Sequence, residues 1–139
     1  MIVAYCDAST IGDNNSATTI LIKNQKFLGA QTRKYKNLKP ANAELMALIL
    51  TLELSKEIDP KEKYLKVFTD CSAIISKYRR LRNNPHLKDY GEYHDEWATI
   101  LRLIEKRNIT ISHIRGHQQN LNPNKVCDLL SRYCAKRGI

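Results

Sequence analysis

The order of strand-like and helix-like segments narrows the possible folds of this chain to a few. Three strand-like segments come first, and Pro40 then opens a helical stretch that runs to about Glu57. The side chains of this stretch are apolar nearly all round, which predicts a largely buried helix. The chain must therefore provide a sheet and further helices to cover it.

Apolar periodicity and turn residues place the other elements. The expected strands cover residues 2–7, 17–24, 26–36, 64–69 and 109–114, and the expected helices cover 40–57, 72–82, about 94–107 and a closing stretch from Asn122. Residues 11–16 read as a polar turn, and Asn24-Gln25 as a tight hairpin. An antiparallel meander followed by helix–strand units predicts an α/β fold, a mixed sheet flanked by helices. At 139 residues we expect a single domain over residues 1–139.

The chain is strongly basic, and its charge is unevenly spread. The formal net charge is +9. No acid lies between Asp13 and Glu44, or between Asp70 and Asp89, and both intervals carry several lysines and arginines. A basic surface around a few acids suits a polyanion whose phosphates approach a bound metal. The simpler reading is a soluble basic protein with no such partner.

Several other classes of protein find no support in the sequence. No apolar run is long enough to span a membrane and no signal sequence opens the chain, so we expect a cytoplasmic protein without a membrane partner. The four cysteines lack zinc-ligand spacing and read as free thiols. Neither a nucleophile elbow nor a glycine-rich phosphate loop is present, which argues against a serine hydrolase or a nucleoside triphosphatase.

Four acids, Asp7, Glu44, Asp70 and Asp128, stand at informative places. Asp7 and Asp70 each close a strand-like run, Glu44 interrupts the apolar helix, and Asp128 follows Gly116-His117 early in the last helical pattern. Each has an ordinary alternative. Asp70 could cap the next helix, Asp7 could close a turn, Asp128 could be a surface residue, and Glu44 could lie on a solvated stripe.

Taken together, the four acids predict a metal site. Carboxylates at two strand ends and on two helices can converge on one point, where they repel unless a divalent cation neutralises them. Carboxylate oxygens suit magnesium or manganese, and two such ions about 4 Å apart can cleave a phosphodiester. His117 lies beside a flexible stretch and could shuttle protons there, or could be a solvated loop residue.

These residues resemble type 1 ribonuclease H over nearly the whole chain. The matching segments are Tyr5-Cys6-Asp7-Ala8-Ser9, Ala43-Glu44-Leu45-Met46-Ala47, Phe68-Thr69-Asp70-Cys71-Ser72, and Gly116-His117 followed by Asn124-Lys125-Val126-Cys127-Asp128. The resemblance implies a mixed five-stranded sheet with helices. It also implies an endonuclease that cuts the RNA strand of RNA–DNA hybrids with two magnesium or manganese ions. The four acids would then be metal ligands, and His117 would assist proton transfer or product release.

The resemblance also implies contacts with the nucleic acid. Asn124 falls at a position that contacts the RNA strand in the family. The segment 77–88 resembles the family's basic protrusion and carries Lys77, Arg79, Arg80 and Arg82. Pro40 and Ser72 stand where the family usually has asparagine and glutamine, and Asn42 is a candidate substitute. Those departures touch the contacts that distinguish RNA from DNA.

Two alternatives stay open from the sequence. A module of the same fold could bind nucleic acid with little or no catalysis. A nuclease of the same fold could instead act on another nucleic acid, such as branched DNA or structured RNA. We expect a monomer, since no surface pattern in the sequence predicts a dimer interface.

Overall fold

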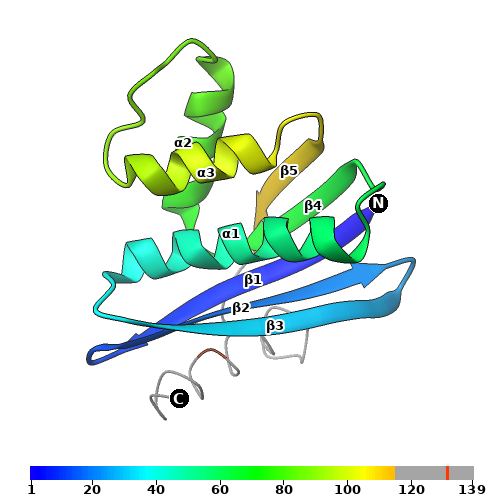
Figure 1. The fold of residues 1–139 in the computed structure, drawn as a ribbon, viewed down its shortest axis with the longest axis horizontal. Helices are drawn as coiled ribbons and strands as arrows, with labels where there is room; N and C mark the ends of the chain where they lie inside the picture. Colours follow the sequence, from blue (N-terminus) through cyan, green and yellow to red (C-terminus); the bar gives the residue numbers. More distant parts are fainter. Residues whose placement is uncertain (115–130, 132–139) are drawn as a thin grey trace.

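The computed structural model describes residues 1–114 and Ser131. The elements are β1 (Ile2–Ile11), β2 (Asn14–Lys23), β3 (Lys26–Lys36), α1 (Pro40–Ile58), β4 (Tyr64–Thr69), α2 (Ser72–Asn83), α3 (His94–Leu103) and β5 (Asn108–His113). The strands form one sheet in the order β3-β2-β1-β4-β5. Figure 1 shows α1 lying across this sheet, with α2 and α3 beyond it toward the β4–β5 edge.

The sheet is mixed, as the sequence predicts. β1, β2 and β3 pair as an antiparallel meander, whereas β4 pairs parallel with β1 and β5 pairs parallel with β4. The Asn24-Gln25 hairpin is confirmed. Both residues have positive φ angles, 53° and 62°. A two-residue turn with positive φ at both positions matches the right-handed twist of the strands that it joins.

The first two strands are longer than the expected ranges 2–7 and 17–24, and the expected polar turn over 11–16 is wrong. β1 extends to Ile11 and β2 begins at Asn14, so that only Gly12-Asp13 is left for the turn. Burial of Asn15 explains the difference. Its side-chain amide donates to Thr10 Oγ1 at 2.7 Å and to the Leu38 carbonyl at 3.0 Å. A polar residue can lie in a buried strand here because its side-chain hydrogen bonds are satisfied.

The predicted buried helix is confirmed as α1. Pro40 stands at its start, where the missing N–H of proline costs nothing. Its polar residues within the buried surface are satisfied as well. Thr51 Oγ1 lies 2.8 Å from Thr19 Oγ1 on β2 and from the Ala47 carbonyl one turn earlier. The helix is therefore fixed to the sheet by apolar contact and by one buried hydroxyl pair.

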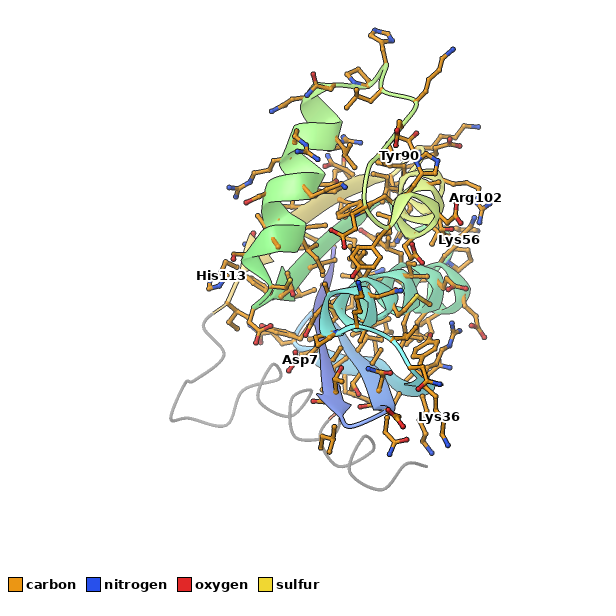
Figure 2. All side chains as sticks on the ribbon, turned by 90° about the vertical axis from the view of Figure 1, so that its left-hand side faces the viewer. Asp7, Lys36, Lys56, Tyr90, Arg102 and His113 are labelled. Carbon is orange, nitrogen blue, oxygen red and sulfur yellow. The ribbon has the colours of Figure 1, made fainter. Side chains whose placement is uncertain are left out.

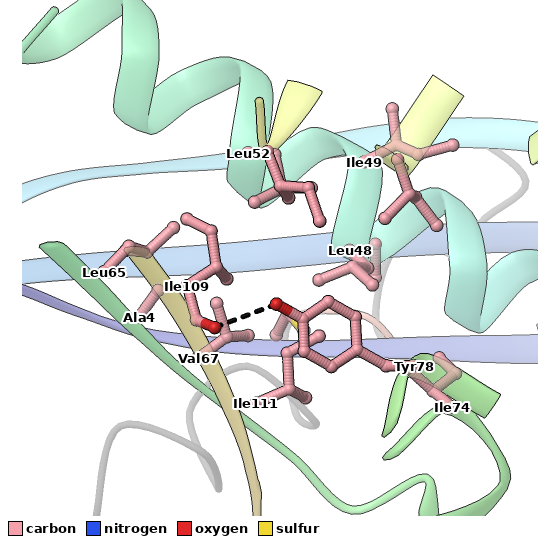
Figure 3. Packing of buried hydrophobic residues seen from close by; sticks show 14 of the residues in the cluster. Ala4, Leu48, Ile49, Leu52, Leu65, Val67, Ile74, Tyr78, Ile109 and Ile111 are labelled. Atoms are coloured by element: carbon pink, nitrogen blue, oxygen red, sulfur yellow. Dashed lines mark hydrogen bonds between the residues drawn. The ribbon is translucent and has the colours of Figure 1, made fainter. Parts of the chain in front are cut away.

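One apolar core joins the sheet to the described helices. Tyr78 of α2 is buried within it, and its hydroxyl donates to the Ile109 carbonyl of β5 at 2.8 Å (Figure 3). Trp97 and Ile100 of α3 are also buried, as their helical spacing predicts. The expected end of that helix near residue 107 is wrong, because the helix stops at Leu103 and a turn over residues 104–107 leads into β5.

The helix predicted from Asn122 lies outside the described residues. Ser131 is the described residue of that region, and it is helical and fully buried. Within the described part of the chain, none of the helices has the length and apolar character needed to cross a bilayer.

Candidate active site

Strand register brings Asp7 and Asp70 together. β1 and β4 run parallel, and the last pair in their register is Tyr5 with Phe68. Asp7 and Asp70 each stand two positions beyond that pair. β1 continues past this point while β4 ends at Thr69, so the two carboxylates meet where the shorter strand stops. The predicted convergence of the two acids is consistent with this register, but the expected position of Asp7 at a strand end is wrong, because β1 continues to Ile11.

Asp7 is held by its neighbours on a buried stretch of β1. Cys6 belongs to the apolar core, and Asp7, next along the strand, is buried as well. Asp7 Oδ1 accepts a hydrogen bond from the Ala8 N–H at 2.9 Å, and the Asp7 carbonyl accepts one from Ser131 Oγ at 3.2 Å. The Ser131 contact ties the C-terminal region to the backbone of this acid.

Asp70 does not cap α2, which removes its ordinary alternative. The N-cap residue is Cys71, and no side chain caps that helix. The backbone around Asp70 is fixed without its carboxylate. Thr69 Oγ1 accepts from the Cys71 N–H at 3.1 Å, and the Thr69 carbonyl accepts from the Ile114 N–H at 3.0 Å. The carboxylate of Asp70 is therefore available to a ligand.

Glu44 completes a cluster of three carboxylates. One oxygen from each of Asp7, Glu44 and Asp70 lies within 4.8 Å of the others. Glu44 Oε2 is buried and has no hydrogen-bond partner among the described residues. Burial, together with the nearby charges of Asp7 and Asp70, raises the pKa of Glu44 to about 9. The alternative that Glu44 lies on a solvated stripe of its helix is therefore wrong.

The donor set of this cluster fits a hard divalent cation. Three carboxylates at this separation repel one another, and a bound cation would offset both that repulsion and the burial of Glu44. All the ligand atoms are oxygens, which magnesium and manganese prefer. Asp128, His117 and Asn124 fall outside the described residues.

A thiol-based alternative finds no support beside the cluster. Burial raises the pKa of the Cys71 thiol above its usual value, and the charges of Glu44 and Asp70 raise it too. A thiol held in its protonated form is a poor nucleophile and a poor metal ligand. Cys6 is buried in the apolar core. Both cysteines therefore read as packing residues, as the sequence indicates.

The basic residues predicted to contact nucleic acid differ in availability. Arg79 and Arg80 are exposed on α2, and the guanidinium of Arg82 lies 5.9 Å from the centre of the Tyr78 ring. Lys77 is half-buried, and its ammonium donates to the Glu92 carbonyl at 3.2 Å. Lys77 therefore supports the connector between α2 and α3 while the arginines face solvent.

Two polar residues flank the cluster at the starts of helices. Ser72 is exposed at the first position of α2. Asn42, in the first turn of α1, has a buried amide oxygen without a hydrogen-bond partner among the described residues. An unsatisfied buried acceptor is uncommon in proteins and is consistent with a missing donor from a ligand.

Sequence reasoning missed an apolar hollow beside the cluster. It measures about 190 Å³ and is lined by Ala41, Leu45, Cys71, Ala73, Ile74, Lys77, Glu92, Tyr93 and Trp97. Trp97 was assigned by its spacing to the core, and it is buried, but one side of it also faces this hollow. The one signal in the sequence that could have pointed to this hollow is that Trp97 is the single tryptophan of the chain.

Comparison with known proteins places this chain among the ribonucleases H. The sequence profile of the RNase H family matches residues 1–136. Ribonuclease H of Chlorobium phaeobacteroides is 30% identical over 122 residues, covering 79% of this chain and 80% of that protein. Ribonuclease H of Trichodesmium erythraeum is 29% identical over 139 residues, covering 94% and 85%.

Solved structures agree on the fold. LC11-RNase H1 in complex with an RNA/DNA hybrid superposes with a TM-score of 0.77 at 18% identity, covering 99% of this chain and 98% of that one. The RNase H domain of PFV superposes with a TM-score of 0.73 at 18% identity, covering 99% and 93%.

A mixed five-stranded sheet with carboxylates gathered at the end of a parallel strand pair defines a ribonuclease H-like protein. The family match over nearly the full length goes further, and the chain belongs to the RNase H family. Members of this family depend on metal, and the acidic cluster of this chain is in keeping with that dependence.

Proposed function

We propose that this protein hydrolyses the RNA strand of RNA–DNA hybrids, with Asp7, Glu44, Asp70 and Asp128 as the ligands of two magnesium or manganese ions. The observation that carries the proposal is the approach of three carboxylates to within 4.8 Å of one another, with a buried oxygen of Glu44 that has no hydrogen-bond partner among the described residues. Such a cluster is unfavourable without a cation, so its assembly at one strand end supports a metal-dependent role. Family membership supports the substrate.

Each of these residues has a separate role in the proposed reaction. When bound, two divalent ions supply an activated water and stabilise the leaving oxygen. The carboxylates hold and space the ions, and the rigid β1 and β4 backbone fixes Asp7 and Asp70. Glu44 loses its proton as it becomes a ligand. His117 moves a proton near the leaving oxygen or assists product release, and the cut leaves a 3′-hydroxyl and a 5′-phosphate.

Contacts with the hybrid fall to residues around the cluster. Asn124 and Asn42 offer amides, and Ser72 offers a hydroxyl, to sugars or base edges. The amide oxygen of Asn42, which is buried without a hydrogen-bond partner within residues 1–114 and Ser131, supports its part in this set. The basic residues of α2, namely Lys77, Arg79, Arg80 and Arg82, contact phosphates. The exposure of Arg79 and Arg80 supports that role for the two arginines. We further propose that the protein acts as a single-domain monomer.

A substrate panel tests this function. The substrates are an end-labelled RNA–DNA hybrid, duplex RNA, single-stranded RNA and duplex DNA, each in magnesium and in manganese, with a chelator control. We expect internal cuts confined to the RNA strand of the hybrid and lost with the chelator. Cuts in the duplex DNA instead, or cuts that survive the chelator, would overturn the proposal.

A second candidate is a nuclease of the same site with another nucleic acid as substrate. It is favoured by Pro40 and Ser72, which stand at the first positions of α1 and α2 beside the cluster, where the family usually carries amides. The same panel, extended by a structured RNA, separates the two candidates, because metal-dependent cleavage of duplex or structured RNA would keep the site and change the substrate.

A further inference from the structure

A basic groove lies at the end of the sheet opposite to the acidic cluster. It measures about 660 Å³ and is lined by Lys56, Pro60, Lys61, Glu62, Lys63, Arg102, Leu103, Glu105, Lys106 and Arg107. Figure 2 shows Lys56 and Arg102 close together and well away from Asp7. The residues come from the end of α1, the turn after α3 and the starts of β4 and β5. Six of them are basic and two are acidic.

Part of this charge has a structural purpose. Lys56 and Arg102 lie in the last turns of α1 and α3, where a cation offsets the negative end of a helix. Arg107 donates to Ser55 Oγ at 3.0 Å and so secures the end of α1. These three residues would be accounted for without any ligand.

Lys61, Lys63 and Lys106 are not accounted for in this way. All three are exposed, and none forms an ion pair with a carboxylate of the described residues. Glu62, the nearest acid in sequence, is already paired with the N-terminal ammonium at 3.2 Å and with Lys23 at 3.4 Å. The groove therefore keeps an excess of positive charge.

The backbone at Lys106 adds an independent observation. Its φ angle is +61°, a left-handed conformation that glycine adopts far more readily than lysine. The position lies in the turn after α3, two residues beyond the C-cap Ile104. A lysine at this point keeps a cation at the groove at some cost to the backbone. The backbone cost is explained if the positive charge of Lys106 binds a ligand in the groove.

We propose that this groove binds the sugar–phosphate backbone of a single-stranded flank that extends from the hybrid. None of the described residues that line it is aromatic, so it would hold phosphates and read no bases. β4 joins the two sites, with Lys63 before its first residue and Asp70 after its last. Its six residues span about 20 Å.

A single strand suits this arrangement better than a duplex does. At about 3.4 Å for each nucleotide, roughly six nucleotides cover the distance from the cluster to the groove. A single strand can turn to follow the end of the sheet, whereas a duplex, with a persistence length of about 150 base pairs, stays straight over so short a path. The proposal rests on the proposed function in taking the hybrid as the partner.

The test compares two labelled hybrids, one blunt and one with a single-stranded DNA flank of 15 nucleotides. Fluorescence anisotropy in the Asp70→Asn background measures binding without cleavage. The groove variant carries Lys61→Gln, Lys63→Gln and Lys106→Gln. The control variant carries Lys26→Gln, Lys34→Gln and Lys36→Gln, which remove the same charge from exposed positions on β3.

We expect the flank to tighten binding roughly tenfold in the parent and the control variant, and to give no gain in the groove variant. The salt dependence of flanked-hybrid binding should fall in slope by about 2, since each lost single-strand phosphate contact contributes about 0.7. No gain from the flank in the parent, or an equal gain in the groove variant, would overturn the proposal. A fluorescent oligoglutamate that binds the parent but not the groove variant, with no gain from the flank, would also overturn it in favour of an acidic protein segment.

The outcome is independent of cleavage. Cleavage of the blunt hybrid, measured with Asp70 intact, should be equal in the groove and control variants, and it also shows that both are folded. If no hybrid is cleaved while the flank still tightens binding through the groove, the proposed function fails and this inference stands.

Discussion

The two ends of β4 carry opposite charge, and they differ in how that charge is held. At the end after Thr69, three carboxylates gather within 4.8 Å, and a buried oxygen of Glu44 has no hydrogen-bond partner in the part of the chain that the structure describes. At the end before Tyr64, lysines stand exposed around an open groove. Buried charge needs a specific partner, whereas exposed charge is satisfied by water and responds to salt. The acidic end is therefore suited to bind ions at fixed positions, and the basic end to attract a polyanion loosely.

The largest expected effect is at the acidic end. Asp70→Asn keeps the shape of the side chain and removes one charged ligand, so hybrid cleavage in magnesium should fall by about a thousandfold or more. The control is Glu57→Gln, which should keep full activity. Glu57 is exposed, and among the described residues it belongs neither to the acidic cluster nor to an ion pair. Single-turnover cleavage rates measure both. If Asp70→Asn kept more than a tenth of the parent's cleavage rate, the acidic end of β4 would not be the ion-binding end.

The next effect concerns pH. The pKa of Glu44 is about 9 in the folded protein against an ordinary value of 4.5, chiefly because of burial. Between these values the folded state holds a proton that the unfolded state has lost, so stability falls as pH rises through this window. In chelator, urea midpoints should therefore decrease from pH 5 to pH 9. Glu44→Gln should flatten that decrease, whereas Glu57→Gln should leave it in place. An identical pH profile for Glu44→Gln and the parent would contradict the buried state of this acid.

Exposed arginines should produce a smaller, salt-dependent effect. Arg79→Gln with Arg80→Gln removes two charges from the outer face of α2 without disturbing the core. Binding of blunt hybrid should weaken severalfold at moderate salt, and the slope of log affinity against log salt should fall by about 1 to 2. The control is Lys34→Gln with Lys36→Gln on β3. Equal slopes for the two double variants would show that net charge alone decides binding.

The smallest effect is at Lys106. Lys106→Gly places glycine at a positive φ angle, so unfolding free energy should rise by about 0.5–1 kcal/mol. Lys88→Gly, in a connector position without a positive φ angle, should not stabilise. Urea denaturation measures both. A loss of stability in Lys106→Gly would mean that the lysine makes contacts that outweigh the cost of its backbone conformation.

The sequence predicted the mixed sheet and all the described helices because apolar periodicity is a local property. It also predicted the convergence of Asp7 with Asp70, because the parallel pairing of β1 and β4 puts the two acids at matching positions, even though Asp7 lies within β1 and not at its end. The full extent of β1 and β2 was missed, because the polar Asn15 of β2 is buried there through side-chain hydrogen bonds to Thr10 of β1 and to Leu38, far along the chain. The polar character of residues 11–16 gives no indication of a partner so distant in the sequence.

The basic groove could not be predicted for the same reason. Its residues stand in three separate stretches of the sequence, and each stretch reads as an ordinary solvated segment. Only the packing of α3 against α1, and of α1 on the sheet, brings their ends together. The hollow beside Trp97 is similar, because helical spacing shows that this side chain is buried but not that one side of it borders a space.

The central claim is that Asp7, Glu44 and Asp70 hold divalent cations, and manganese binding tests it most directly. Electron paramagnetic resonance of free manganese measures how much ion the protein removes from solution, without any substrate. We expect saturable binding by the parent and by Glu57→Gln, and an affinity at least tenfold weaker in Asp70→Asn. Equal manganese affinity in the parent and in Asp70→Asn would contradict the account.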